Sequence, residues 1–210
     1  MHGIRKGPSL LGLFFLLNQF MKNIYEILLS TILDEIIPMT KKAVSKGNKI
    51  FGAAILNKRD FSTIVVGINN EIINPLMHGE ISAINKFYIN NFDKNYNPKD
   101  CIFLTTHEPC SLCLSAITWA GFDNFYFFFP YEDTKKTFNI PHDLKILNEI
   151  FYIKNGDYNK SNKFWNSFSI LDEIKNEPKF IIKVKKIFSE YQKLSEKYQK
   201  LKKYNTIPLN

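Results

Sequence analysis

Residues 125–129 read Phe-Tyr-Phe-Phe-Phe, and this aromatic run constrains the fold more than any other stretch of the chain. A strand with apolar side chains on both of its faces is stable only when other elements cover both sides of its sheet. Such a strand is typical of proteins in which helices pack on a central sheet. We therefore expect the run to be a buried strand of a layered domain.

Hydrophobic periodicity gives the order of the elements before this run. Apolar residues recur at a spacing of four from Met21 to about Lys46, which predicts a helix that Pro38 kinks or splits. Residues 50–56 and 61–67 flank a polar turn and predict a β-hairpin. A helix, a strand and a helix should follow, over residues 77–91, 101–106 and 110–120. This order of helices and strands predicts an α/β domain.

Beyond Pro130 the pattern is less regular. We expect a loop over residues 131–142 and a helix over residues 143–152. A further helix should present one apolar face, formed by Phe164, Trp165, Phe168, Ile170 and Leu171. Pro178 breaks the chain before a basic helix over residues 179–203. No stretch between these elements is long enough to be a linker to a second domain.

The positive charge of the chain is concentrated near its end. The formal net charge is +8, which suits an anionic partner such as a nucleic acid. Most of the excess comes from residues 179–203, where nine lysines face only Glu190 and Glu196. A lysine run of this kind more often forms the solvated face of a helix than a nucleic-acid site. RNA therefore remains an alternative partner that the charge alone does not favour.

The cysteines and the N-terminal segment bear on the compartment. Cys101, Cys110 and Cys113 cannot all pair with one another, and two metal-bound thiolates in a reduced compartment fit better than a disulfide scaffold. The apolar run from Leu10 to Leu17 resembles a weak signal peptide, but no cleavage site follows it and it is too short to span a membrane. We expect a cytoplasmic protein with no membrane association.

Three potential metal ligands occur at the starts of two predicted helices. Cys110 and Cys113 are three residues apart, so both sulfurs can point to one ion, and the helix dipole favours their thiolate forms. His78 begins the other helix. Three protein ligands with a fourth position open to water are typical of a catalytic rather than a structural zinc site. The pattern therefore predicts a hydrolytic Zn²⁺ centre.

Glu80 is the candidate catalytic acid and base. It follows His78 by two residues, so it points in another direction around the helix yet stays near the metal. Zinc lowers the pKa of a bound water to around neutrality, and a nearby carboxylate can accept its proton and pass it to a leaving nitrogen. Taken alone, Glu80 is an ordinary acid of a first helical turn, and His78 an ordinary helix cap. Only the combination of Glu80 with the His78, Cys110 and Cys113 ligand set predicts catalysis.

The pattern His78-Gly79-Glu80 with Pro109-Cys110-Ser111-Leu112-Cys113 resembles the cytidine/deoxycytidylate deaminase superfamily. The resemblance covers roughly Met21 to Pro130. It implies a three-layer α/β/α fold with a mixed central sheet of about five strands, a zinc cofactor and hydrolytic deamination of a base. The chain would then divide into an N-terminal extension, a zinc deaminase domain and a helical, basic C-terminal extension, over residues 1–20, 21–152 and 153–210.

The resemblance also implies roles around the zinc site. Glu80 would protonate the ring nitrogen of the base and the leaving ammonia. Asn69 matches the base-contacting Asn of the family, and Phe51 belongs to the strand pattern that lines its pocket. Each has a plain alternative, since Asn69 can cap its own turn and Phe51 can be a core aromatic. Family members commonly pair, so a homodimer is expected.

The flanking residues give mixed indications of the substrate. Residues 78–82 are similar to fungal cytosine deaminases, whereas residues 113–120, which include Trp119, resemble bacterial guanine deaminases. Asp133 matches an acid that the guanine enzymes carry, although a solvated loop acid is the simpler interpretation. A free nucleobase or small nucleoside, with cytosine or guanine foremost, is therefore the expected substrate.

Two other functions remain open. Transfer-RNA adenosine deaminases share the same core, and the basic C-terminal segment could hold an RNA backbone, but the continuation after Cys113 departs from that branch. The chain could also be a catalytically silent scaffold with a structural zinc ion. Glu80 argues against a scaffold, since a structural site has no need of that acid.

Overall fold

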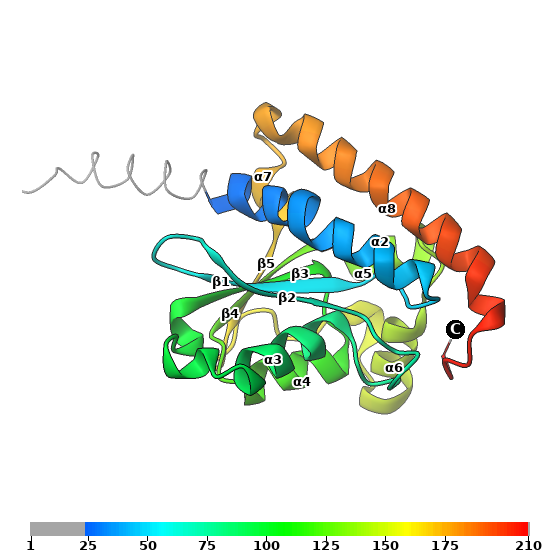
Figure 1. The fold of residues 1–210 in the computed structure, drawn as a ribbon, viewed down its shortest axis with the longest axis horizontal. Helices are drawn as coiled ribbons and strands as arrows, with labels where there is room; N and C mark the ends of the chain where they lie inside the picture. Colours follow the sequence, from blue (N-terminus) through cyan, green and yellow to red (C-terminus); the bar gives the residue numbers. More distant parts are fainter. Residues whose placement is uncertain (1–23, 210) are drawn as a thin grey trace, which may run out of the picture.

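The computed structural model describes residues 24–209, which build a five-stranded mixed sheet with helices on both faces (Figure 1). The strand order is β2-β1-β3-β4-β5. The strands span Gly52–Asn57 (β1), Thr63–Ile68 (β2), Cys101–His107 (β3), Asn124–Phe129 (β4) and Asn166–Ser169 (β5). β1 is antiparallel to β2 and β3, whereas β3, β4 and β5 are parallel. The expected three-layer fold is confirmed.

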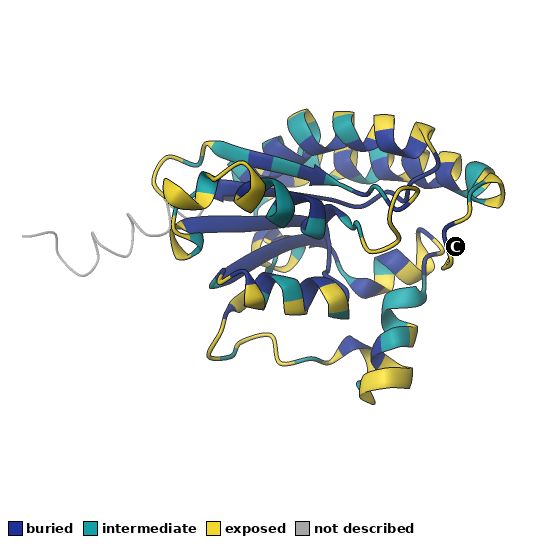
Figure 2. Ribbon diagram, turned by 60° about the horizontal axis from the view of Figure 1, so that its bottom comes forward, coloured by how far each residue is buried: buried dark blue, intermediate teal, exposed yellow. Residues whose placement is uncertain are grey.

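The aromatic run forms the centre of the core. Every residue of β4 is buried, and its aromatic side chains divide between two hydrophobic clusters. Phe125 and Phe127 face α3 (Gly79–Ile89) and α4 (Ser111–Trp119), the two helices on one face of the sheet. Tyr126 and Phe128 face the opposite layer. Figure 2 shows the central strands as the most continuously buried part of the fold.

The second layer pairs the N-terminal helix with α8 (Ile181–Leu201). The N-terminal helix is helical from residue 24, passes through a π-helical turn at Ile32–Ile36 (η1) and continues as α2 (Ile37–Ser45). Pro38 lies in the first turn of α2, directly after the π turn. Proline has no N–H to donate, and a wider turn accommodates that loss without ending the helix. The helix therefore continues through Pro38.

Two predictions beyond Pro130 are wrong. Residues 131–142 contain a helix, α5 (Tyr131–Lys136), because acids in its first turn and lysines in its last complement the helix dipole. Residues 164–171 are not one helix, because the segment enters the sheet as β5 and only then turns into α7 (Ile170–Ile174). The ring of Phe168 stacks on Tyr126 of β4 at 4.7 Å between centroids. The sheet thus takes a strand from the segment expected to be an extension.

The remaining elements are short, apart from α6 (His142–Phe151), which lies where a helix was expected. Single 3₁₀ turns occur at Phe92–Lys94 (η2), Pro98–Asp100 (η3), Lys154–Gly156 (η4), Pro178–Phe180 (η5) and Lys202–Tyr204 (η6). None of the helices within residues 24–209 combines the length and the apolarity needed to cross a membrane. The extension predicted at residues 1–20 lies outside the described residues.

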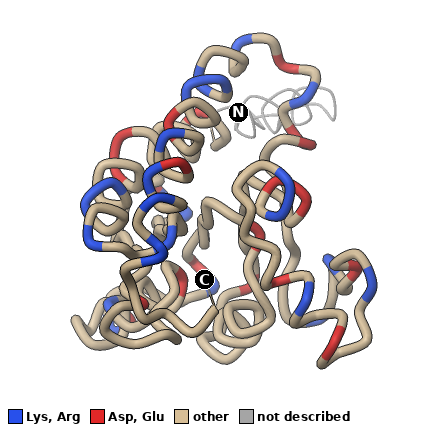
Figure 3. The backbone as a smooth tube through the Cα atoms, turned by 90° about the vertical axis from the view of Figure 1, so that its right-hand side faces the viewer, with Lys and Arg blue, Asp and Glu red and all other residues tan. Residues whose placement is uncertain are grey.

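The basic helix α8 is a packing element as well as a charged surface. Ile187, Tyr191, Leu194 and Tyr198 are buried against the sheet layer. Lys183 donates to Glu26 and Ser30 of the N-terminal helix, and Glu190 pairs with Lys41 of α2 and Lys193. Figure 3 shows basic and acidic residues mixed along these two helices. Part of the lysine excess therefore holds α8 in place.

Candidate metal centre and active site

The candidate metal ligands lie at the starts of two neighbouring helices. His78 is the N-cap of α3 and Cys110 is the N-cap of α4, and both have extended backbone conformations. α3 and α4 pack on the same face of the sheet, so their N-termini meet near the end of β3. The N-cap residue lies at the end of its helix, so the side chains of His78 and Cys110 can approach each other. Two motifs that are about 30 residues apart in the sequence therefore meet in one site.

Gly79 allows α3 to lie directly on the sheet. A Cβ atom at Gly79 would lie 2.7 Å from the Cα of Gly52 in β1, and one at Gly67 in β2 would lie 2.2 Å from the carbonyl oxygen of Gly79. Both distances are shorter than contacts between real carbon and backbone atoms allow. The glycine between His78 and Glu80 is therefore required by backbone contact with the strands.

The loop that precedes α4 is held by a buried acid. Glu108 accepts hydrogen bonds from the backbone N–H of Tyr131 and from the hydroxyl of Tyr158, each at 3.0 Å, and its carboxylate lies 3.1 Å from Lys160 Nζ. Because Glu108 comes two residues before Cys110, these contacts fix the approach to the ligand loop. They also connect that loop to segments far along the chain.

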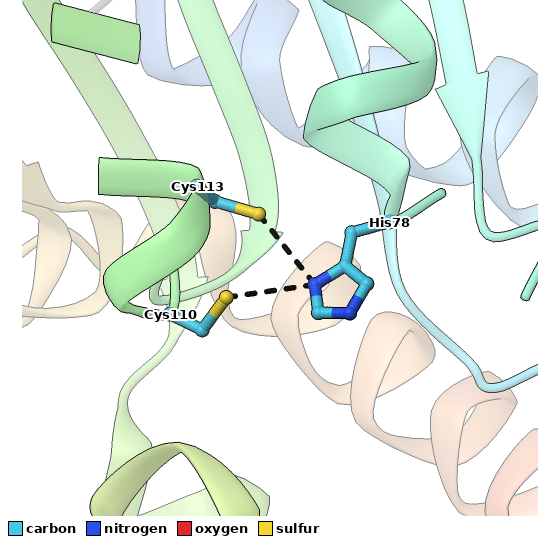
Figure 4. A group of neighbouring side chains, drawn as sticks. All are labelled: His78, Cys110 and Cys113. Atoms are coloured by element: carbon cyan, nitrogen blue, oxygen red, sulfur yellow. Dashed lines mark hydrogen bonds between the residues drawn. The ribbon is translucent and has the colours of Figure 1, made fainter. Parts of the chain in front are cut away.

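The three ligand atoms are spaced as one zinc ion requires (Figure 4). His78 Nδ1 lies 3.5 Å from Cys110 Sγ and 3.6 Å from Cys113 Sγ. A tetrahedral zinc ion about 2.3 Å from sulfur and about 2.0–2.1 Å from nitrogen would separate those atoms by about 3.6 Å. The donor set and its spacing thus fit Zn²⁺, and the three ligand atoms lie within 4.8 Å of one another.

The electrostatics of this group favour a bound cation. Burial raises the pKa of Cys113, and the neighbouring Cys110 raises it further. A hydrogen bond from Cys113 lowers the pKa of Cys110 well below its usual range, against the effect of burial. Burial alone would lower the pKa of His78, but the hydrogen bond and charge of Cys110 raise it to about 9. The thiolate of Cys110 is therefore stabilised by protons on Cys113 and His78. A bound metal ion would take the place of these protons.

Glu80 has the properties of a proton carrier. It lies in the first turn of α3, is 5% exposed, and accepts a hydrogen bond from Cys113 Sγ at 3.3 Å. Burial, together with the negative charge of Cys110, raises the pKa of Glu80 to about 7. A carboxyl group with this pKa can both accept and release a proton near neutral pH.

A cavity of about 320 Å³ opens beside the ligands. Its polar wall includes His78, Cys110, Lys49, Glu71, His142 and Asp143. Its apolar wall is formed by Phe51, Pro75, Leu76, Leu112, Ile140, Ile146, Ile207, Pro208 and Leu209. A smaller void of about 10 Å³ contacts Glu80 as well as His78, Cys110, Phe51 and Asp143. The cavity is at the small end of the range for ligand sites in proteins, about 300–1,000 Å³.

The structure brings some of the predicted substrate residues together and separates others. Phe51 lines both spaces beside the ligands. Asn69 is buried behind them, where its Oδ1 accepts from Gly79 N at 2.6 Å and its Nδ2 donates to Glu71 at 2.8 Å. Trp119 is 91% exposed and lines a separate hollow with Trp165, and Asp133 lies on α5 beside Thr137. Neither Trp119 nor Asp133 lines the cavity, so the structure does not support these two placements.

Asp143 is a site residue that sequence reasoning missed. It lies in the first turn of α6 and lines both the cavity and the smaller void. Burial, and then the charge of Cys110, raise its pKa well above the usual range of a carboxyl group. The helix itself was expected, but no local signal indicates that its first turn faces the zinc ligands.

The C-terminal residues 207–209 were also missed. They follow α8 and line the cavity together with Leu76 and Ile146. Figure 1 shows the chain turning back from the end of α8 towards α6. Their position depends on the whole length of α8, which carries the chain across the sheet. Only the apolar character of these residues, after a strongly basic segment, was a usable signal.

Comparisons with known proteins agree with this geometry. Residues 28–129 match the family model described as the cytidine and deoxycytidylate deaminase zinc-binding region. Guanine deaminase of Bacillus subtilis (strain 168) is 40% identical over 72 residues, which are 33% of this chain and 44% of that protein. Cytosine deaminase of Candida albicans is 36% identical over 90 residues, which are 41% of this chain and 56% of that protein. The chain spans about half the length of the curated relatives it matches.

A solved structure of guanine deaminase from Nitrosomonas europaea shares the fold. It superposes with a TM-score of 0.51 at 15% identity, over 77% of this chain and 81% of that one. The superposition covers a larger share of this chain than residues 28–129, the part that matches the family model.

Proposed function

We propose that this protein is a zinc-dependent hydrolase that deaminates a nucleobase or small nucleoside, because residues 28–129 match the model of the cytidine and deoxycytidylate deaminase zinc-binding region. The observation that carries the proposal is the position of Glu80, a buried carboxyl in hydrogen-bonding contact with one of three zinc ligands. A structural zinc site would gain nothing from that acid. A non-catalytic scaffold is therefore the weaker alternative.

The reaction would replace the amino group on a ring carbon by a carbonyl oxygen and release ammonia. Bound zinc supplies Lewis-acid activation of a water molecule. Glu80 lies beside the ligand sulfur of Cys113, where it can accept a proton from that water. It can pass that proton to the ring nitrogen as the C–O bond forms, and then move the remaining proton of the added hydroxyl to the amino group as the C–N bond breaks, which leaves a carbonyl and ammonia. A pKa of about 7 suits both directions of transfer.

The cavity supports a small substrate. Its volume is about 320 Å³, and Leu76, Leu112 and residues 207–209 are among the apolar residues that line it. Phe51 offers an aromatic surface beside the ligands, and Asp143 offers a carboxyl group for the polar edge of a base. Guanine and cytosine are the first substrates to test, since both curated relatives are named for them.

Editing of transfer RNA is the second candidate function, favoured only by the basic surface of α8. Several of its charged groups already pair within the fold, as Lys183 does with Glu26. The C-terminal residues that line the cavity also leave less room for a polynucleotide.

We also propose a cytoplasmic homodimer. All three cysteines are free, as a reduced compartment requires, and the side chain of Trp119 on α4 is almost fully exposed. Light scattering of the purified protein tests the dimer, and a mass equal to one chain would contradict it.

Ammonia release is the decisive test of the activity. The zinc-loaded protein is incubated with guanine, cytosine, cytidine and adenosine, with Glu80→Gln as the matched control. Release from at least one of them, abolished in the control, is expected. Release from none of these compounds, together with inosine formation in transfer RNA, would move the assignment to the RNA enzyme. Failure with every substrate would contradict deamination.

A further inference from the structure

The imidazole of His78 has a partner on the side away from the sulfurs. Nδ1 faces Cys110 and Cys113, while Nε2 lies 3.7 Å from Oε1 of Glu71, an ionic contact rather than a full hydrogen bond. Glu71 lies outside the zinc motif, in the turn between β2 and α3. A carboxylate facing the second nitrogen of a metal-binding histidine holds the ring orientation and directs the other nitrogen to the metal.

Glu71 is buried and fully engaged. Its side chain is 1% exposed, and Lys49 Nζ, on a side chain that is 7% exposed, donates to Oε1 at 2.8 Å. An unpaired carboxylate at this depth would be costly, so the lysine offsets the loss of hydration. Two buried charges at one wall of a small cavity are an expensive arrangement for stability alone, which points to a role in the site.

The same carboxylate also holds the backbone at the start of α3. Its second oxygen, Oε2, accepts a hydrogen bond from Asn69 Nδ2, and Asn69 Oδ1 accepts one from Gly79 N. Gly79 is the residue after His78. Glu71 therefore reaches the ligand by two routes, one through the imidazole ring and one through the backbone that carries it.

We propose that Glu71 is the positioning residue of His78, with Lys49 as its counter-charge and Asn69 as its link to the first turn of α3. The proposal uses only the zinc site, and the identity of the substrate does not enter it. Glu71 has no contact with the sulfurs, so it acts through the histidine. Removal of such a partner typically weakens metal binding by about 10- to 100-fold.

The test measures zinc affinity in the absence of substrate, by competition with a chromophoric chelator. Glu71→Gln is expected to bind zinc about 10- to 100-fold more weakly than the unchanged protein. Glu132→Gln removes a carboxylate from the exposed ion pair with Lys136 and should leave zinc affinity unchanged. Unchanged affinity in Glu71→Gln would overturn the proposal.

A second variant separates positioning from stability. Glu71→Gln leaves Lys49 buried without its anion, so that protein could fold poorly for reasons unrelated to zinc. Combining it with Lys49→Met removes both charges and should restore the melting temperature while zinc binding stays weak. If the double variant binds zinc as tightly as the unchanged protein, Glu71 has no positioning role.

Cobalt adds a readout that a merely structural role would not change. In the Co²⁺-loaded double variant, the sulfur-to-cobalt charge-transfer bands should persist, because both cysteines still bind. The d–d bands, which report the geometry of all ligands, should shift. An unchanged d–d spectrum would contradict the proposal. Absence of metal binding in the unchanged protein would instead contradict the zinc site itself.

Discussion

The carboxyl group of Glu80 and the sulfur of Cys113 lie 3.3 Å apart, although they belong to different helices. The proposed proton carrier and a candidate metal ligand therefore share one hydrogen bond between α3 and α4. Glu80 is 5% exposed and Cys113 is fully buried, so this contact lies inside the protein.

Glu80→Gln should remove catalysis and keep the metal. Glutamine preserves the shape of the side chain but cannot carry a proton, so kcat should fall by about 10²- to 10⁴-fold. Zinc content should stay near one ion per chain, because Glu80 is not a ligand. Steady-state rates and atomic absorption check both points, and a variant that keeps most of its kcat would contradict the role of Glu80.

Cys110→Ala and Cys113→Ala should lose zinc and activity together, because each removes one of three protein ligands. The matched control is Cys101→Ala. Cys101 is also buried, and burial raises the pKa of its thiol to about 11, but it lies on β3 outside the ligand group. This control should keep its zinc. Zinc loss in all three variants would indicate general misfolding rather than loss of ligands.

Glu190→Gln should weaken the docking of α8 in a pH-dependent way. Hydrogen bonds from Lys193 and then Lys41 lower the pKa of Glu190 to about 2, from about 4.5 in the unfolded chain. The stabilisation is therefore fully present above about pH 4.5 and lost as the pH falls towards 2. The free energy of unfolding of the variant should be lower by about 1 kcal/mol or less near neutral pH, since both lysines are exposed.

Urea unfolding of both proteins near neutral pH and near pH 3 measures this difference. The gap between them should narrow at the lower pH. A gap that widens on acidification would contradict the assigned pairing.

Removal of residues 207–210 should enlarge the cavity without affecting the metal. Ile207, Pro208 and Leu209 form part of its apolar wall, and none of them belongs to the group of potential metal ligands. KM for a free base should rise, because less apolar surface encloses it, and zinc content should not change. An unchanged KM would show that these residues do not contact the substrate.

Asn69→Ala distinguishes two roles for a residue first predicted to contact the base. Its amide joins Glu71 to the N–H of Gly79, and loss of a buried partner of this kind costs about 1–3 kcal/mol. We expect lower stability and weaker zinc binding. A rise in KM alone, with stability and zinc affinity unchanged, would favour the direct base contact.

The grouping of His78, Cys110 and Cys113 could be predicted because it follows from short local patterns in the sequence. His78 and Cys110 each begin a helix, and helix starts are among the features that short stretches of sequence determine well. The aromatic run of β4 likewise indicates burial on both faces by itself. Local sequence was sufficient wherever a residue's role follows from its own element.

The parts that were missed depend on contacts between distant segments. β5 pairs with β4 across about 40 residues, and the stacking of Phe168 on Tyr126 decides its conformation against a helical pattern. Asp143 and residues 207–209 reach the cavity only because α6 and α8 are packed where they are. No spacing within the sequence carries that information.

The contact of Gly79 with the Gly52 backbone implies different effects for substitutions of core side chains and for substitutions of the glycines at the contact. Because backbone atoms, not side chains, set the distance between α3 and the hairpin, enlarging or trimming side chains in the core beneath α3 should change stability more than ligand geometry. A single methyl group at Gly67 or Gly79 should do the reverse, because it would meet backbone atoms at the contact between α3 and the strands and so displace His78. Tolerance to substitution in this domain is thus expected to be lowest where the residues are smallest.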